Sequence, residues 1–190
     1  MTLDPTALPD DLPVPEDDGA ADHLVGRPVP ALSLRSTDGV DVDLLAESRR
    51  GRVVVFGYPR TGRPGVQAPS GWDDIPGARG CTPQACSFRD LADEFAALST
   101  TVYGLSTQDP GYQAEAVARL QLPYALISDE HLALATALRL PTFDVDGTTL
   151  LRRLTMVLVD GVVQHVIYPV FPPDRAAADT VALLRGGACG

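Results

Sequence analysis

The sequence of 190 residues contains no lysine, no asparagine and no long apolar run. Without lysine, Schiff-base chemistry, a Walker A phosphate loop and a kinase-type catalytic lysine are excluded. Without asparagine, there is no N-glycosylation motif and no Cys-His-Asn triad. Because no stretch of about 18 or more apolar residues is present, we expect no segment that spans a membrane.

Basic side chains are also scarce, because 15 arginines stand against 25 acidic residues and give a formal net charge of −10. This charge argues against a nucleic-acid partner and against an anionic membrane surface. Hydrophobic residues make up 45% of the chain, which excludes a disordered protein as the main interpretation. The length favours one domain with a sizeable core.

The first basic residue is Arg27, and proline and aspartate dominate the segment before it, so a secretory signal peptide is not expected. We expect residues 1–25 to form a flexible, acidic, proline-rich lead and residues 26–190 to form the domain. The three cysteines are too few, and odd in number, for a secreted disulfide framework. We therefore expect a cytoplasmic protein whose cysteines are catalytic, redox-sensing or metal-binding.

Continuous β-branched and aromatic runs alternate with helical apolar spacing along the chain. The strands expected from these runs span residues 31–34, 53–58, 101–106, 124–127, 154–159 and 162–167. The expected helices span residues 82–98, 112–120, 132–138 and 174–184. Asp160-Gly161 predicts a hairpin between the last two strands. The alternation predicts an α/β, thioredoxin-like three-layer domain with a central mixed β-sheet flanked by helices.

One long segment, residues 60–80, has no periodicity and contains glycine and proline throughout. Loops longer than about 12–15 residues are uncommon in compact domains and are usually functional or disordered. The only tryptophan, Trp72, lies in this loop. It either pins the loop to the body of the domain or forms part of a contact surface.

The cysteine pair stands at the start of the first long helix, in the segment Gly80-Cys81-Thr82-Pro83-Gln84-Ala85-Cys86. We expect Thr82 to cap this helix, with Pro83 at its first position. The helix start stabilises a thiolate, which is the nucleophilic form of cysteine. Five residues of helix place the two Cα atoms roughly 8.6 Å apart. A disulfide tolerates at most about 7 Å, so a Cys81–Cys86 bond requires the first turn to unwind.

Other interpretations of the cysteines compete with a reactive pair. Cys86 could simply pack in the core, because cysteine is among the most buried residue types. A zinc site needs a second pair of ligands, and the candidates His23, His131, His165 and Cys189 are scattered. The spacing also differs from the Cys-x-x-Cys motif of thiol oxidoreductases.

Residues 80–86, followed by Phe88-Arg89-Asp90, resemble the active-site segment of Q-type peroxiredoxins, also called the bacterioferritin comigratory protein group. The resemblance extends over about residues 26–184. The further matching segments are residues 26–30, 55–59, 104–106, 126–129 and 153–155.

The resemblance implies a thiol peroxidase on a thioredoxin-like fold, acting on a hydroperoxide. Cys81 would attack the peroxide and become a sulfenic acid, and Cys86 would resolve it by forming a disulfide. A thioredoxin-type dithiol would reduce that disulfide. Arg153 would stabilise the thiolate and position the peroxide, and Pro59 would shield the site. No metal or organic cofactor is implied, and we expect a monomer.

The chain departs from the family pattern at one position, because Ala78 stands where a threonine normally precedes the cysteine by three residues. Thr61 could fold back to supply the hydroxyl, Thr82 could substitute for it, or the contact could be missing. Arg79 adds a positive charge that either assists Cys81 or is a solvated loop charge.

A rival interpretation is a redox-sensing interaction protein, in which the Cys81–Cys86 switch remodels the loop without useful turnover. Cys189, close to the C-terminal end, is either an incidental exposed thiol or an additional resolving thiol.

Overall fold

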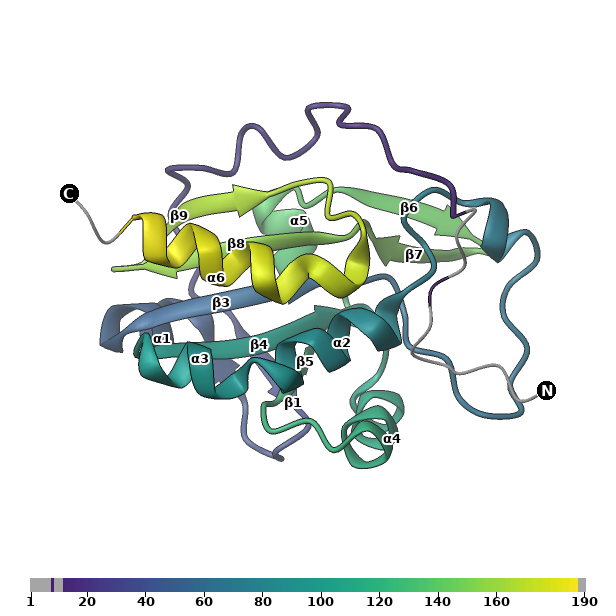
Figure 1. Cartoon of the computed structure of the whole chain (residues 1–190), viewed down its shortest axis with the longest axis horizontal. Helices are drawn as coiled ribbons and strands as arrows, with labels where there is room; N and C mark the ends of the chain where they lie inside the picture. Colours follow the sequence, from purple (N-terminus) through teal and green to yellow (C-terminus); the bar gives the residue numbers. More distant parts are fainter. Residues whose placement is uncertain (1–7, 9–11, 188–190) are drawn as a thin grey trace.

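The computed structural model describes residue 8 and residues 12–187 as a mixed α/β domain around a curled sheet (Figure 1). The strands are β1 (Ser33–Ser36), β2 (Val42–Asp43), β3 (Arg52–Gly57), β4 (Thr100–Ser106), β5 (Leu126–Ser128), β6 (Thr142–Val145), β7 (Thr148–Leu151), β8 (Leu154–Val159) and β9 (Val162–Ile167). The helices are α1 (Leu44–Arg50), η1 (Trp72–Asp74), α2 (Cys81–Asp90), α3 (Ala92–Ala97), α4 (Pro110–Leu120), α5 (Ala133–Leu138), η2 (Pro173–Arg175) and α6 (Ala176–Gly186).

The main sheet has the strand order β2-β1-β5-β4-β3-β8-β9. β3, β4 and β5 pair in parallel, whereas β1, β8 and β9 join in antiparallel fashion. Helices α2, α3 and α6 cover one face, and α1 and α5 lie behind the other (Figure 1). The expected three-layer domain with a mixed sheet is confirmed.

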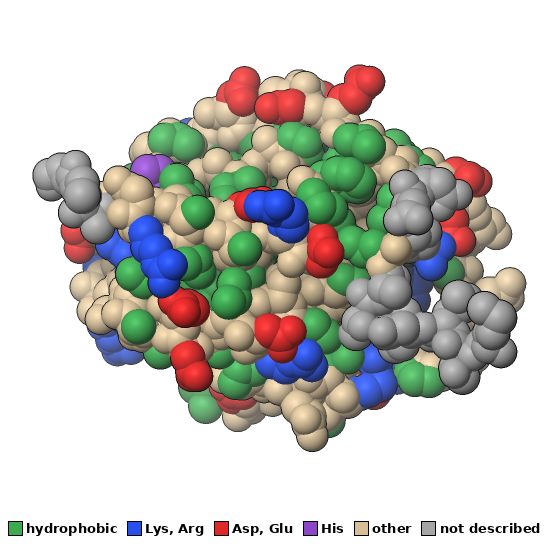
Figure 2. All heavy atoms as spheres, viewed as in Figure 1, with side chains coloured by type: hydrophobic (Ala, Val, Ile, Leu, Met, Phe, Trp, Pro, Cys, Tyr) green, Lys and Arg blue, Asp and Glu red, His purple; other side chains and the backbone are tan. Residues whose placement is uncertain are grey.

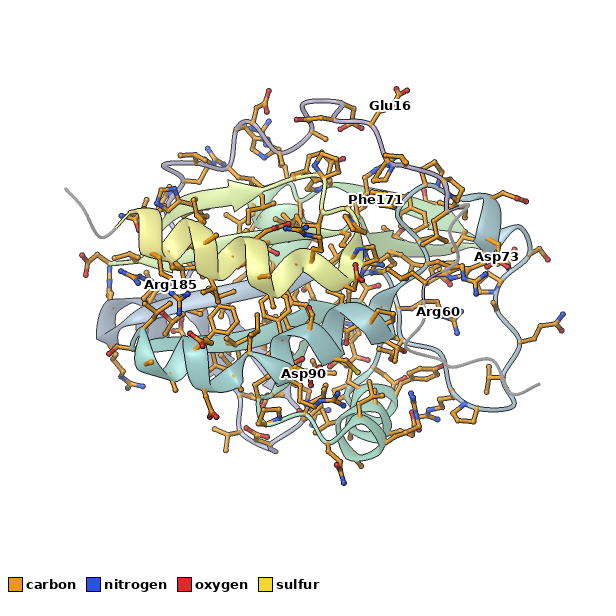
Figure 3. The ribbon with its side chains drawn as sticks, in the orientation of Figure 1. Glu16, Arg60, Asp73, Asp90, Phe171 and Arg185 are labelled. Atoms are coloured by element: carbon orange, nitrogen blue, oxygen red, sulfur yellow. The ribbon has the colours of Figure 1, made fainter. Side chains whose placement is uncertain are left out.

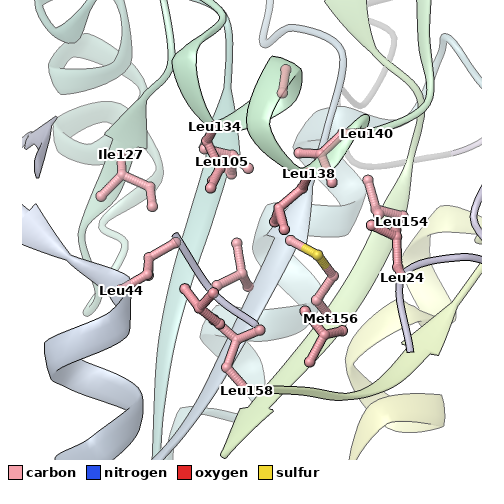
Figure 4. Close-up of a cluster of buried hydrophobic side chains, with 14 of the residues drawn as sticks. Leu24, Leu44, Leu105, Ile127, Leu134, Leu138, Leu140, Leu154, Met156 and Leu158 are labelled. Carbon is pink, nitrogen blue, oxygen red and sulfur yellow. The ribbon is translucent and has the colours of Figure 1, made fainter. Parts of the chain in front are cut away.

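Strand β3 shows why a continuous apolar run forms a central strand. Val53 and Val55 point into one hydrophobic cluster, and Val54 and Phe56 point into the other. Successive side chains alternate between the two faces of a strand, so all four are buried. Figure 4 shows the first cluster, where leucines from α1 and α5 meet Met156 of β8. Strand β3 thus fixes where the following loop leaves the sheet.

The helix expected over residues 82–98 is two helices, and the expectation of one continuous helix is wrong. The backbone leaves the helical conformation at Leu91, between α2 and α3. The spacing of apolar residues does not reveal this break, because Phe88 and Phe95 still face the same cluster, with ring centroids 5.5 Å apart. The helix is therefore interrupted without changing which face is buried.

The hairpin at Asp160-Gly161 is confirmed, since both residues have positive φ and join antiparallel β8 and β9. A second hairpin, β6–β7, was not expected from the sequence. Its turn is Asp146-Gly147, again with positive φ at both residues. This two-stranded ribbon is separate from the main sheet and supports the loop 60–80.

Part of the N-terminal lead packs on the domain. Leu24 is fully buried and Ala21 is 4% exposed, both in the first hydrophobic cluster. The hydroxyl of Tyr168 donates a hydrogen bond of 2.9 Å to Asp18. The packed part of the chain therefore begins before residue 26, because apolar side chains of the lead complete the core.

Acidic, basic and apolar side chains are interspersed over α2, α3 and α6 on the face shown in Figure 2. Within the described part of the chain, no helix has the length and apolar character needed to cross a membrane.

Candidate active site

Cys81 lies where the loop 60–80 enters helix α2. It is the first residue of α2 and is 5% exposed. Gly80 caps the helix with φ of 100°, and a Cβ at this position would lie 2.3 Å from Cγ of Pro173. The expectation that Thr82 is the cap is therefore wrong. No side chain accepts from the first turn, so the N–H groups of Cys81 and Thr82 are left to stabilise negative charge at Cys81, whereas Pro83 has no N–H and the Gln84 N–H donates to the Gly80 carbonyl.

Arg153 lies in the connection between β7 and β8, and its side chain extends to Cys81. Its side chain is 3% exposed, and Nη2 donates to the Cys81 sulfur at 3.4 Å. The same nitrogen donates to the backbone carbonyls of Gly77, Ala78 and Arg79 at 3.2, 3.3 and 2.9 Å. A buried guanidinium at this distance stabilises a thiolate, and its other contacts fix its orientation.

Gln84 is a site residue that the sequence analysis missed. It is fully buried, three residues after Cys81 on α2, and its Oε1 accepts a hydrogen bond from Nη1 of Arg153. Its Nε2 has no hydrogen-bond partner among the described residues. Residues at i and i+3 share a helix face, which is the signal that could have placed Gln84 beside Cys81.

A hollow of about 130 Å³ opens above Cys81, and we call it the cysteine hollow. Thr82 lines it, whereas Pro59 is buried two residues after β3 and is not among its described lining residues. Thr61 is buried, and its hydroxyl donates to Oε1 of Gln108 at 3.2 Å. In this structure the hydroxyl of Thr61 is therefore engaged away from Cys81.

Cys86 lies in the same intact helix and is also buried. It borders a second hollow of about 300 Å³ between α2 and the start of α6, which Cys81 does not line. Both cysteines are reduced here. The helix keeps their Cα atoms roughly 8.6 Å apart. Cys189 lies outside the described residues.

The loop 60–80 is fixed to the β6–β7 hairpin through Trp72. Its side chain is 9% exposed and packs with Ala78 and Leu150, with its ring centroid 6.3 Å from that of Phe143. Trp72 thus pins the loop to the domain. Arg79 forms an ion pair within the same loop, with its Nη1 3.2 Å from Oδ2 of Asp73. Its side chain is 40% exposed.

Tyr58 and Tyr124 pack in the same hydrophobic cluster as the two cysteines. Burial raises the pKa of Tyr58, whose hydroxyl accepts a hydrogen bond from Gln113. Burial also raises the pKa of Tyr124 well above its usual range. The Tyr124 hydroxyl donates to the Ala85 carbonyl at 2.7 Å and so ties α2 to the sheet. No group of three or more His, Cys, Asp or Glu that could hold a metal ion occurs among the described residues.

The geometry defines a buried thiol at a helix start, beside an arginine, on a thioredoxin-like sheet. The redoxin family model matches residues 24–184, so the chain belongs to the redoxin family. It is 32% identical over 161 residues to the chloroplastic peroxiredoxin Q of Oryza sativa subsp. japonica. That match covers 84% of this chain and 66% of the rice protein.

Solved structures agree with this assignment. The chain is 30% identical to the peroxidoxin BcpB of Mycobacterium tuberculosis, with a TM-score of 0.69, over 86% of this chain and 97% of that one. Peroxiredoxin Q of Xanthomonas campestris shares the fold, with a TM-score of 0.65 at 21% identity, over 94% of this chain and 99% of that one. The resemblance is confirmed: within the redoxins, the chain belongs to the Q-type peroxiredoxins.

Proposed function

We propose that this protein is a thiol peroxidase that reduces hydrogen peroxide and organic hydroperoxides at Cys81. The observation that carries the proposal is the buried guanidinium of Arg153, 3.4 Å from the Cys81 sulfur at a helix start. Both features stabilise the thiolate, which is the attacking form. The membership in the Q-type group supports the same chemistry.

In the first step, the Cys81 thiolate attacks the terminal oxygen of the hydroperoxide R–O–O–H. An S–O bond forms, the O–O bond breaks, and the RO⁻ group leaves and takes up a proton to become the alcohol ROH. The sulfur loses two electrons and becomes a sulfenic acid, while the peroxide is reduced. Negative charge develops on the leaving oxygen, and the guanidinium of Arg153, whose donors are fixed before the reaction begins, is placed to stabilise it.

In the second step, the Cys86 thiol condenses with the sulfenic acid, giving a Cys81–Cys86 disulfide and one molecule of water. A dithiol of the thioredoxin type then reduces the disulfide, restores two thiols and leaves oxidised itself. Because an intact α2 holds the two residues too far apart, resolution requires the first turn of the helix to open.

Peptide mass mapping tests the assignment of the two cysteines. The reduced protein receives one equivalent of hydrogen peroxide, and thiols and disulfides are then mapped. We expect a Cys81–Cys86 disulfide in the unaltered protein and an accumulating Cys81 sulfenic acid in Cys86→Ser. Cys189→Ser is the matched control and should behave as the unaltered protein. Unmodified thiols, or a disulfide to Cys189, would contradict the proposal.

Turnover with a dithiol reductant separates the peroxidase from the rival redox sensor. With thioredoxin, its reductase and NADPH present, a peroxidase consumes many equivalents of hydrogen peroxide per protein. A sensor consumes one equivalent and stays oxidised. We expect continued turnover, abolished in Cys81→Ser, and a burst of a single equivalent would favour the sensor.

The identity of the reductant, the monomeric state and a cytoplasmic location remain part of this proposal. Sedimentation of the reduced and oxidised protein tests the monomer. Cell fractionation tests the compartment, which is chloroplastic for the plant relatives.

A further inference from the structure

Two hollows meet at Arg60. The cysteine hollow has a volume of about 130 Å³, and a neighbouring hollow, which we call the outer hollow, has about 450 Å³. Arg60 is the one described residue that lines both. Figure 3 places Arg60 at the end of the molecule where the loop 60–80 runs, on the same side as Asp73. The two spaces therefore border the same residue.

The guanidinium of Arg60 is held only by weak contacts. Its Cζ lies 5.9 Å from the ring centroid of Trp72, which lines the cysteine hollow. Its Nη2 donates a long hydrogen bond of 3.4 Å to Tyr112, which lines the outer hollow. It forms no ion pair with any residue in the described part of the chain. The Arg60 side chain is partly exposed, and exposed side chains exchange rotamers within picoseconds to nanoseconds.

The outer hollow has the size of a ligand site and a mixed lining. Pockets for small organic molecules usually measure about 300–1,000 Å³ and are mostly apolar, with a few polar groups. The outer hollow has both polar lining residues, such as Gln67, Thr107 and Asp109, and apolar ones. Apolar contact comes from Ala68 and Pro69 of the loop, Val145 and Leu150 of the β6–β7 hairpin, and the Tyr112 side chain. The loop and the hairpin are joined by Trp72, so one wall of the hollow is held in place by the other. The cysteine hollow alone is too small for such a ligand.

We propose that the outer hollow receives the organic substituent of a bulky hydroperoxide, and that Arg60 is the residue that determines this specificity. This inference rests on the proposed peroxidase function. The peroxide group reacts at Cys81 as described, and the alcohol ROH forms with its substituent in the outer hollow. The guanidinium of Arg60 moves aside to let the substituent pass, whereas hydrogen peroxide needs only the cysteine hollow.

Filling the outer hollow tests the proposal. Ala68 is exposed and lines the outer hollow, so Ala68→Phe narrows it without disturbing the core. Ala97→Phe, at the exposed end of α3, is the matched control because it lines neither hollow. We expect Ala68→Phe to lower the ratio of kcat/KM for cumene hydroperoxide to kcat/KM for hydrogen peroxide about ten-fold or more. An unchanged ratio, equal to that of Ala97→Phe, overturns the proposal.

Removing the Arg60 side chain should change the same ratio of kcat/KM values in the opposite direction. We expect Arg60→Ala to raise the same ratio by about three-fold or more, because the two hollows merge. The double variant Arg60→Ala/Ala68→Phe should lose this gain. If Arg60→Ala lowers kcat/KM for both peroxides in proportion, Arg60 acts at Cys81 instead, and its role as a partition is overturned.

Binding can also be followed without turnover. Trp72 is the only tryptophan and contacts Arg60, so its fluorescence reports on the boundary of the two hollows. The product alcohol 2-phenylpropan-2-ol should change this fluorescence saturably, and Ala68→Phe should weaken the change. A response that Ala68→Phe leaves intact contradicts the proposal. Absence of hydrogen peroxide turnover in the unaltered protein would instead overturn the proposed function and this inference together.

Discussion

The buried amide of Gln84 offers the sharpest test of how the site is organised. Its Oε1 accepts from Nη1 of Arg153, and Nη2 of Arg153 donates to the Cys81 sulfur and to the loop carbonyls. In Gln84→Leu, the guanidinium loses one buried acceptor but keeps its charge. The variant therefore changes how Arg153 is held and leaves the sulfur, the helix start and the arginine in place.

The size of the effect follows from one hydrogen bond. A hydrogen bond to a charged group contributes about 1.5–3 kcal/mol. If all of it is lost from the transition state, kcat/KM for hydrogen peroxide falls about 10- to 150-fold, since about 1.4 kcal/mol is a factor of ten. Because Arg153 keeps its contacts to Gly77, Ala78 and Arg79, we expect the lower end of this range.

Two measurements separate positioning from a general loss of structure. We expect alkylation of Cys81 by iodoacetamide to slow less than its oxidation by peroxide, because alkylation does not require Arg153 to orient an O–O bond. Gln113→Leu is the matched control, since it removes another fully buried amide, which donates to Ser106 and to the Ile127 carbonyl. If Gln84→Leu keeps kcat/KM within about two-fold of the unaltered protein, the reasoning about Arg153 is refuted.

Three further substitutions have defined outcomes. Arg153→Lys should lower kcat/KM for hydrogen peroxide about 10²–10³-fold, because the single ammonium nitrogen of lysine cannot donate both to the Cys81 sulfur, as Nη2 does, and to Oε1 of Gln84, as Nη1 does; stopped-flow oxidation measures this. Gly80→Ala should destabilise the fold by about 1–2 kcal/mol or more in urea unfolding, since its φ is 100° and its Cβ would strike Pro173. Trp72→Ala should cost about 3 kcal/mol in the same assay, and a loss below about 1 kcal/mol would contradict its role in pinning the loop.

The parts of the fold that follow from local chemistry could be predicted from the sequence. The run Val53–Phe56 has no polar position and is rich in β-branched residues, which favours a strand buried on both faces. Asp160-Gly161 has the residues that a tight hairpin requires. The placement of Arg153 beside Cys81, by contrast, came from resemblance, because 72 positions of sequence separate them and no local pattern links them.

The structural features that could not be predicted from the sequence depend on tertiary contacts. Gln84 is a polar residue on a helix, and it would ordinarily face solvent; its burial follows from a partner far along the chain. Leu24 is one of four leucines in a proline- and aspartate-rich lead, and its burial depends on the folded core against which it packs. The position of Arg60 beside both hollows depends on its contacts with Trp72 and Tyr112, which come from two different elements.

The contacts of Arg153 also bear on whether the site works as an enzyme or as a switch. In the proposed cycle, disulfide formation opens the first turn of α2 and removes the Cys81 sulfur from its contact with Arg153. The loop 60–80 has two attachments that do not involve this sulfur, because Arg153 donates to the Arg79 carbonyl and Trp72 packs against the β6–β7 hairpin. Beyond the first turn, the Tyr124 hydroxyl and the buried Phe88 ring hold the helix in place. We therefore expect the opening to be confined to a short segment that can close again after reduction, which suits repeated turnover better than a signal carried by the loop.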